Sequence, residues 1–226
     1  MSSKPYAEIE LSVSVSPDTV SLSRLDEPLN IIVAAKTISS SKPSSGVVIN
    51  TRWTALDDRG AGLFMGALFL KSISDPAKVI PFAPAVSAPY PSHPPSDLRK
   101  SELELFKVVP GVDKGELTGT HEINGERIFQ YSTKTRPSDI SPGSEYRIEF
   151  ARKRLGAFWW TFEDEAEGKM FFDGMFPDED DCFGLRAEDP AFIEERYKEG
   201  YLYSYQMNDL KYSINEDSST TIRFVE

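Results

Sequence analysis

The sequence predicts a mainly β protein whose strands form a two-layer sandwich. Apolar and polar residues alternate in several short segments, as expected for strands that bury one face against a core. Proline, glycine and serine cluster between these segments, and such residues favour turns and loops. The chain has 226 residues, of which 39% are hydrophobic, so a single domain over residues 1–226 can bury a complete core.

The most informative segment is the strand predicted at residues 145–150. Pro142 and Gly143 provide a turn signal directly before it. Three apolar side chains fall on one face of this strand: Tyr146, Ile148 and Phe150. The tyrosine resembles the tyrosine corner of fibronectin type III and other immunoglobulin-like sandwiches, in which the hydroxyl bonds to backbone a few residues upstream. The resemblance implies an immunoglobulin-like antiparallel β-sandwich and no particular chemistry.

Alternating patterns predict the other strands of the sandwich. They lie at residues 9–15, 20–22, 29–35, 47–53, 64–70, 103–109, 128–132 and 220–224. The apolar run at 64–70 is also compatible with a buried helical turn. We expect Trp53 to be the core tryptophan of the third strand. We expect Asn124 and Gly125 to form the turn that leads into the strand at 128–132.

A proline-rich segment interrupts this series of strands. Seven of the sixteen prolines lie between residues 76 and 95, a density that excludes a central strand or a helix. We expect a long loop that lies over the sandwich, because too few residues lie on either side for two complete cores. A second loop, the serine-rich loop, is predicted at residues 39–46.

An insertion that a plain sandwich does not need is predicted at about residues 163–219, before the last strand. Eleven acidic and two basic residues between Glu163 and Asp189, the acidic segment, carry nine of the eleven net negative charges of the protein. One short helix is predicted here, since Asp189 and Pro190 form a start signal and Gly200 a stop. Because the insertion lies between the last two strands, we expect it to leave the sandwich at the same end as the serine-rich loop.

Aromatic side chains concentrate in the same region. Residues 158–205 hold thirteen of the twenty-six aromatic rings. We therefore predict a ligand-binding site with aromatic walls and an acidic rim; the alternative is that these rings form a small core that holds the insertion on the sandwich. The candidate ligand-binding residues are Trp159, Trp160, Phe171, Phe172, Tyr201, Tyr203, Asp178 and Asp180.

Three chemical roles for the acidic segment stay open. The run from Asp178 to Asp181 offers oxygen ligands for calcium but lacks the spacing of an EF-hand loop. Two of the carboxylates would serve a glycosidase, although nothing in the sequence selects the pair. Ring faces and carboxylates together would also suit a cationic ligand, or a reaction that passes through positive charge.

Other catalytic constellations are absent from the sequence. The two histidines, His93 and His121, and the single cysteine, Cys182, are too few for a zinc site of histidine and cysteine ligands. Acidic neighbours disfavour a reactive Cys182 thiolate. We expect His121 to be a surface residue of a strand. There is no nucleophile elbow, phosphate-binding loop or dinucleotide-binding fingerprint, and we predict no metal and no cofactor.

Charge and cysteine content limit the expected partners and compartment. A net charge of −11 argues against nucleic acid and against an anionic membrane surface as partners. A single cysteine cannot form an intrachain disulfide, and no secretory signal or membrane-spanning run is evident. We expect a soluble, cytoplasmic protein that binds a small molecule or a protein partner.

The order of these motifs resembles a group of uncharacterised β-sandwich proteins of filamentous fungi. The shared features, within residues 8–162, are a first strand rich in serine and valine, the strand Val47–Trp53, the turn Val108–Gly111, the segment Pro142–Tyr146 and the pair Trp159–Trp160. This resemblance implies a fold and no known activity. We therefore expect a non-catalytic binding or interaction protein. The alternative is a cofactor-independent cyclase or isomerase of fungal specialised metabolism, with a carboxylic acid of the insertion as general acid in an aromatic pocket.

Overall fold

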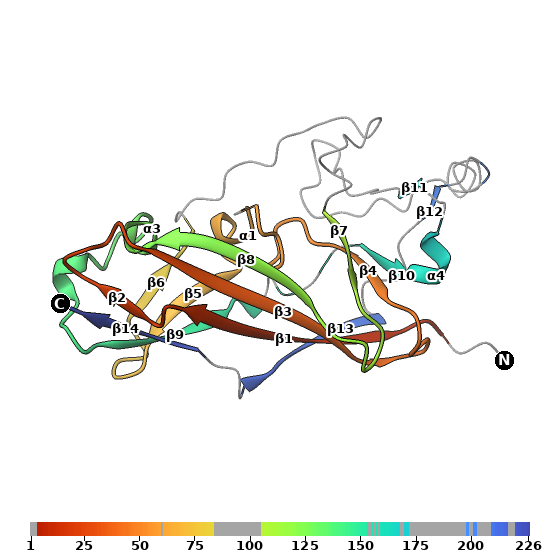
Figure 1. The fold of residues 1–226 in the computed structure, drawn as a ribbon, viewed down its shortest axis with the longest axis horizontal. Coiled ribbons are helices and arrows are strands. Elements are labelled where there is room, and N and C mark those ends of the chain that lie inside the picture. Colours follow the sequence, from red (N-terminus) through yellow and green to blue (C-terminus); the bar gives the residue numbers. More distant parts are fainter. Residues whose placement is uncertain are drawn as a thin grey trace.

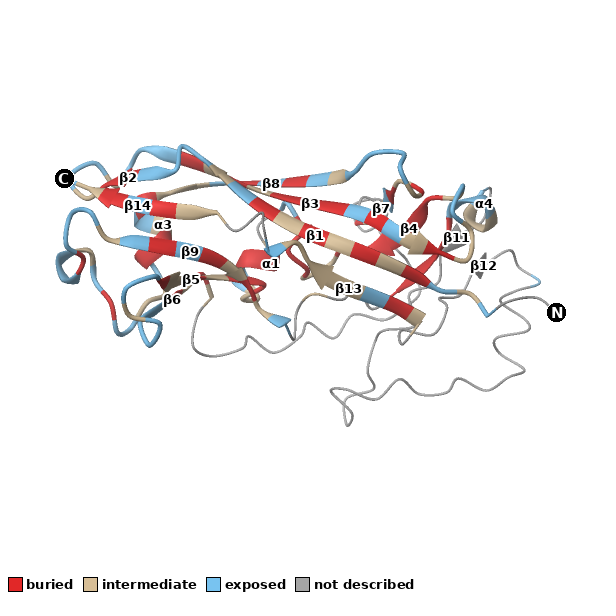
Figure 2. Cartoon of the chain, turned by 90° about the horizontal axis from the view of Figure 1, so that it is seen from below, coloured by how far each residue is buried: buried red, intermediate tan, exposed pale blue. Residues whose placement is uncertain are grey.

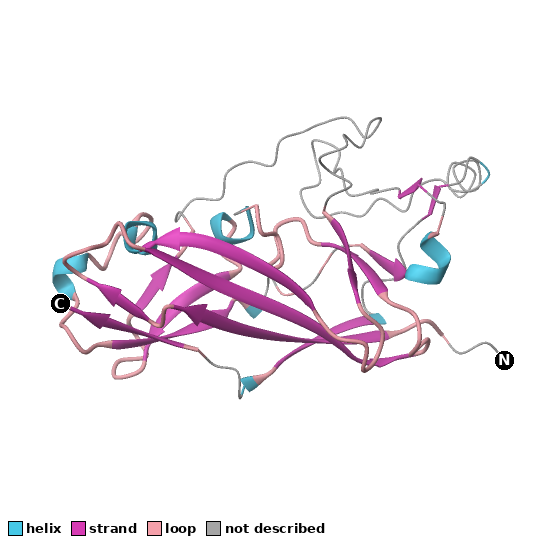
Figure 3. Ribbon diagram, in the orientation of Figure 1, coloured by secondary structure: helices cyan, strands magenta, loops and turns pink. Residues whose placement is uncertain are grey.

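The fold is seen in a computed structural model of the chain. It describes residues 4–59, 61–83, 105–152, 155, 157, 159–167, 170–171, 198, 201–202, 209–216 and 220–226. The architecture is mainly β, as the sequence predicts, with short helical segments between the strands (Figure 3). Most strands belong to two layers that run along the length of the molecule (Figure 1).

The first layer is sheet A, a four-stranded sheet with the order β13–β1–β3–β8. Its strands are β1 (Ala7–Ser16), β3 (Pro28–Ser40), β8 (Leu117–Asn124) and β13 (Leu210–Ile214). Neighbours are antiparallel except β13, which pairs in parallel with β1. Because β13 lies inside the predicted insertion at 163–219, that insertion contributes a strand to the frame. β8 and β13 form the two edges of the sheet.

The second layer is sheet B, a five-stranded sheet with the order β2–β14–β9–β5–β6. Its strands are β2 (Thr19–Ser21), β5 (Leu68–Ser72), β6 (Val79–Pro81), β9 (Glu145–Phe150) and β14 (Thr221–Val225). β2 pairs in parallel with β14, and the other neighbours are antiparallel. The strand predicted at 145–150 is confirmed as β9 and lies at the centre of this sheet.

A smaller sheet and the helices complete the frame. Sheet C has the order β10–β4–β7 and consists of β4 (Val47–Asn50), β7 (Phe106–Val109) and β10 (Trp160–Phe162). The short helices are α1 (Ala61–Phe64), α3 (Gly125–Phe129) and α4 (Glu163–Ala166), and η1 (Pro137–Asp139) is a 3-10 turn. In Figure 1, α3 and α4 lie at opposite ends of the molecule.

One hydrophobic core is shared by all three sheets. Buried side chains alternate with more exposed ones along β1 and β9, which is the pattern of strands with one buried face (Figure 2). Phe224 of β14 is fully buried, and its ring centre lies 5.4 Å from that of Tyr146 and 5.7 Å from that of Phe129. These rings connect the central strand of sheet B to helix α3.

The turn before β9 forms as predicted. Gly143 adopts φ +88°, a conformation that favours glycine, and its N–H donates to the Phe224 carbonyl at 2.7 Å. Tyr146 is buried at the start of β9. Burial raises the pKa of its hydroxyl, and a hydrogen bond with the Ser72 side chain, its register partner on β5, acts against that rise. The immunoglobulin-like connection of the strands stays a prediction.

The predicted strand at 128–132 is wrong. Residues 125–129 form helix α3, because the Asn124 side chain caps it by accepting a hydrogen bond from the Arg127 N–H at 2.9 Å. Asn124 and Gly125 therefore begin a helix and not a hairpin. The strand of this region is β8, which precedes the turn signal.

Trp53 is also placed differently from the prediction. It lies beyond the end of β4, in a turn with φ +62°, and is only partly buried, with the Arg52 guanidinium 5.4 Å from its ring centre. The fully buried tryptophan of the main core is Trp160. For residues 64–70, the predicted strand and the alternative helical turn are each partly correct, since Phe64 ends helix α1 and Leu68 begins strand β5. In the proline-rich segment, Pro81 lies on β6, an edge strand.

We expect Phe224→Ala to lower the free energy of unfolding by about 3–5 kcal/mol, because it removes a buried ring that two other rings contact. Denaturant unfolding followed by fluorescence measures this loss. The control is Ile73→Ala, at an exposed apolar residue, which should change stability by less than about 0.5 kcal/mol. Equal losses in the two variants would contradict the shared core.

Candidate functional site

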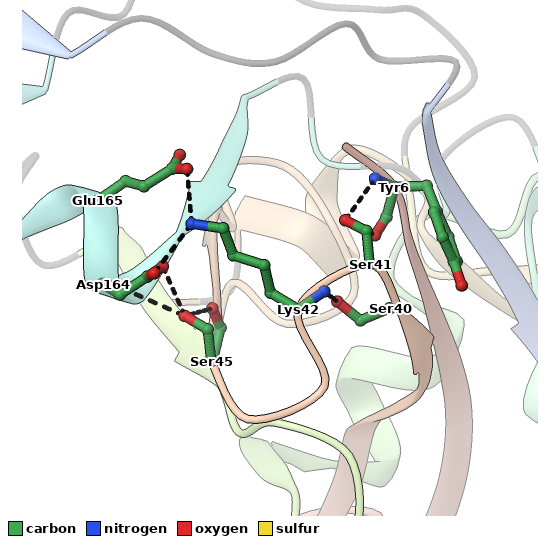
Figure 4. A network of polar contacts seen from close by, with 8 residues as sticks. Tyr6, Ser40, Ser41, Lys42, Ser45, Asp164 and Glu165 are labelled. Atoms are coloured by element: carbon green, nitrogen blue, oxygen red, sulfur yellow. Dashed lines mark hydrogen bonds and ion pairs between the residues drawn. The ribbon is translucent and has the colours of Figure 1, made fainter. Parts of the chain in front are cut away.

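The acidic segment begins beside the serine-rich loop, which confirms the predicted juxtaposition. Lys42 of the loop reaches α4, where its Nζ lies 2.8 Å from Asp164 Oδ2 and 2.7 Å from Glu165 Oε1 (Figure 4). The Ser45 hydroxyl donates to Asp164 Oδ1 at 2.9 Å. The Lys42 ammonium also lies 5.2 Å from the ring centre of Phe162. These contacts fasten the start of the segment to the frame.

Lys42, Ser45, Asp164 and Glu165 form a group that we call the Lys42 cluster. Its electrostatics are those of a structural contact between two segments of the chain. Hydrogen bonding to Lys42 lowers the pKa of Asp164, and burial acts against this without reversing it. Burial acts to lower the pKa of Lys42, but its hydrogen bonds to Asp164 and Glu165 outweigh burial and raise it. The Lys42 and Asp164 side chains are 36% and 55% exposed, so solvent screens the pair and its contribution to stability is small.

Two of the predicted ligand-binding residues lie in the interior. Trp160 is fully buried in the main core, with its ring centre 5.5 Å from that of Phe162. Trp159 is 2% exposed and packs edge-on against Phe106 at 5.0 Å, in a small second cluster with Val48. Both indoles thus have packing partners in sheet C, and their role in ligand binding stays a prediction.

The remaining predicted residues are mostly outside the described residues. Phe171 and Tyr201 belong to two short parallel strands, β11 (Met170–Phe171) and β12 (Tyr201–Leu202), whose pairing brings the backbones of residues 170 and 201 together. Phe172, Tyr203, Asp178 and Asp180 lie outside the described residues, as do the calcium-like run at 178–181 and nearly all of the predicted helix at 189–200.

A different site emerges around His121 of β8. The sequence predicts that His121 is a surface residue of a strand. The strand is confirmed as β8, but the predicted exposure is wrong, because His121 is only 2% exposed. Along β8, Gly119 and His121 are buried, whereas Thr118, Thr120 and Glu122 are exposed. The signal in the sequence is this alternation, with glycine at one inward position.

Only one nitrogen of the buried imidazole has a hydrogen-bond partner. His121 Nε2 lies 2.7 Å from the Ala55 carbonyl oxygen, an acceptor, so Nε2 carries the proton. Nδ1 has no partner in the structure. Burial lowers the pKa of His121, and the nearby Ala55 carbonyl and the Asp57 and Asp58 carboxylates only partly offset this. Near neutral pH the ring therefore has an unprotonated Nδ1 that is buried and has no hydrogen-bond partner among the described residues.

The loop that receives His121 is held by its own hydrogen bonds. The Thr54 hydroxyl donates to the Thr51 carbonyl at 2.8 Å. The buried Asp57 carboxylate accepts from the Trp53 N–H at 3.1 Å and from Arg59 Nε at 3.3 Å. An Asp side chain in these contacts supports the left-handed backbone at Trp53. The loop is thus an ordered platform under β8.

An open groove of about 610 Å³ runs beside β8 at this point. Its lining, which defines the β8 groove, is Asp26, Pro28, Asp58, Arg59, Leu63, Thr120, His121, Glu122, Ile123, Asn124 and Arg127. Five of these are consecutive residues of β8, and the rest come from the β2–β3 connection, the first residue of β3, the loop before α1, α1 itself and α3. The volume falls in the range of small-ligand sites.

The charged residues of the β8 groove differ in their pairing. Asp58 is paired with Lys107 at 2.7 Å, and Arg59 with Asp57. Arg127 donates to the Phe82 carbonyl at 3.1 Å and lies over a tyrosine ring, and burial lowers its pKa. Among the described contacts, Asp26 and Glu122 have no cationic partner. The groove therefore offers two unpaired carboxylates at its rim.

The described residues contain no group of three or more His, Cys, Asp and Glu side chains placed to hold a metal ion. Within the same part of the chain, no helix is long and apolar enough to cross a membrane. Comparison with family models, curated proteins and solved structures found no match to this chain. The site must therefore be interpreted from its own geometry.

For the Lys42 cluster, we expect a double-mutant cycle of Lys42→Met and Asp164→Asn to give a coupling energy of about 0.2–1 kcal/mol. Because Asp164 has a lowered pKa in the folded state, this contribution is present near neutral pH and is lost as pH falls through that value. Urea unfolding at pH 7 and at low pH measures it. A coupling that survives 1 M salt unchanged would contradict a solvent-screened cluster.

For His121, we expect stability to fall on acidification below pH 6.5. The folded-state pKa lies below the ordinary value of 6.5, so the unfolded chain binds more protons in that window and the free energy of unfolding decreases as pH falls. The slope is at most about 1.4 kcal/mol per pH unit. His121→Gln, which keeps a donor for Ala55, should remove this component, whereas His93→Gln should retain it. Identical slopes in both variants would refute the assignment.

Proposed function

We propose that this protein is a binding protein and that the β8 groove is its recognition site. The observation that carries the proposal is the unpartnered Nδ1 of the buried His121 beside that groove. A buried acceptor without a donor costs about 1–3 kcal/mol, and a ligand that donates an N–H or O–H to it recovers this cost. An acceptor left unpaired beside a groove is therefore better suited to binding than to stability.

The composition of the groove indicates a polar ligand. Its lining combines carboxylates, guanidinium groups and the hydroxyl of Thr120 with few apolar side chains. Such a site can recognise a ligand by its hydrogen-bonding groups as well as by contact with the apolar side chains of Pro28, Leu63 and Ile123. A cytoplasmic location belongs to the same proposal and rests on the single Cys182, which cannot form an intrachain disulfide.

The aromatic and acidic insertion remains a second proposed interaction site, for a small molecule or a protein partner. The attachment of its first residues to the serine-rich loop supports this, because a fixed base would hold the insertion at one end of the frame. The alternative function, a cyclase or isomerase, needs a carboxylic acid of that insertion as general acid. We favour binding, because the unpaired acceptor beside the groove accounts for recognition without a catalytic partner.

The test uses the His93→Gln protein, in which His121 gives the single histidine ring signal. In the ligand-free protein we expect the nitrogen chemical shifts of a neutral imidazole with a protonated Nε2 and an unbonded Nδ1. Glycerol, acetamide and methylammonium chloride at millimolar concentration supply hydroxyl, amide and ammonium donors. At least one should shift the Nδ1 signal and the amides of β8.

The matched control for this experiment is His121→Phe, which fills the ring site without an acceptor. It should fold with similar stability, since it removes an unsatisfied polar atom along with one hydrogen bond. The β8 amides of this variant should respond more weakly to the same three compounds. A ring that remains unperturbed by all three compounds in the parent protein would refute the proposed site.

A further inference from the structure

The wall of the β8 groove is the free edge of a sheet. β8 is the last strand of sheet A, and it pairs with β3 on one side only. Residues 120–124 line the groove in unbroken order, so their backbone faces it as well as their side chains. Alternate residues of an edge strand direct N–H and C=O groups away from the sheet. Apart from the ladder with β3, the described residues make no backbone hydrogen bond to residues 117–123.

The other edges of sheets A, B and C carry the features by which proteins protect free edges. They are short, and several contain a lysine or proline. These edge strands are β13 with five residues and Lys211, β2 with three, β6 with three and Pro81, β10 with three, and β7 with four and Lys107. β8 has eight residues, contains neither lysine nor proline, and keeps an unshifted register with β3. Among the edge strands that the structure describes in these sheets, β8 is the one without these protective features.

We propose that the β8 groove receives an extended peptide segment, which adds to sheet A as a strand beside β8 and places a lysine or arginine opposite Glu122. This inference rests on the proposed function and names its ligand class. Backbone pairing supplies affinity, and side chains on alternate faces supply specificity.

The two faces of β8 specify what the added strand carries. Glu122 lies on the exposed face and has no described ion pair, so a cationic residue directly across from it is favoured. His121 faces the opposite side, where a neighbouring residue of the peptide with a hydroxyl or amide would donate to Nδ1. Asp26 at the rim, which has no described ion pair, also favours a basic segment.

A second copy of the chain fits the groove less well than a single peptide strand. Besides β8, the groove is lined by Asp58, Arg59, Leu63 and Arg127 of the neighbouring loop and helices. A docking sheet would have to continue past these residues, whereas one strand ends within the groove.

The experiment uses the whole chain and the capped heptapeptide Thr-Val-Thr-Lys-Thr-Val-Thr, which presents lysine on one face and threonine hydroxyls on the other. We expect binding to shift the amide signals of residues 118–124 and to slow their hydrogen exchange. The same peptide methylated on every backbone nitrogen cannot donate to β8 and should bind about tenfold more weakly or not at all. This comparison leaves the protein unaltered.

A charge-reversal variant tests the position of the cation. Glu122→Lys should weaken the lysine peptide about threefold and improve a peptide with glutamate in place of lysine by a similar factor. The matched control is Glu145→Lys on β9, another exposed strand glutamate, which changes net charge equally and should leave the preference unchanged.

Three results would overturn the inference. Unchanged β8 amides, with His121 still responding to glycerol, acetamide or methylammonium, would refute strand addition and leave the proposed function standing. Equal binding of the N-methylated peptide would show that the backbone edge is not the contact. A dimer in sedimentation, with residues 118–124 protected without peptide, would identify a second copy as the occupant.

Discussion

The close contact between β8 and the loop at residues 54–57 is the constraint on which the site depends. A Cβ at Gly119 would lie 3.1 Å from the Leu56 carbonyl oxygen, so glycine lets the loop approach more closely than a side chain would. Two residues further, His121 donates to the Ala55 carbonyl of the same loop. Asp58 and Arg59 follow directly and form the facing wall of the groove. The contact between Gly119 and the loop thus helps to position β8, the His121 ring and residues 58–59.

The stability of the folded protein does not by itself explain why an imidazole occupies the position of residue 121. Its Nε2 bond contributes about 0.5–1.5 kcal/mol, whereas an unsatisfied buried Nδ1 costs about 1–3 kcal/mol. An apolar ring of similar size would fill the space without this cost. The Lys42 cluster is the opposite case, since its ammonium has two carboxylate partners and Asp164 also bonds to Ser45. The contacts of the Lys42 cluster account for it as a structural attachment, whereas the unsatisfied His121 ring supports the proposed ligand site.

The sequence predicts the frame well where alternation is regular. β1, β3, β9 and β14 are recognisable because each buries one face, and the turn at Gly143 follows from its own residues. Local signals failed near residue 124, where the same Asn-Gly pair suits a hairpin turn or a helix start. The capping bond of the Asn124 side chain selects the helix.

The site could not be predicted because its signal depends on tertiary structure. High densities of charge and aromatic rings are visible in a sequence, and they direct attention to residues 158–205. A missing hydrogen bond on His121 and a free edge on β8 are visible only once the order of strands is known. The sequence of an eight-residue strand does not show whether that strand lies at the centre or at the edge of a sheet. Its position beside an open groove, without the protection that the other described edges have, is what supports the proposal that it binds a peptide.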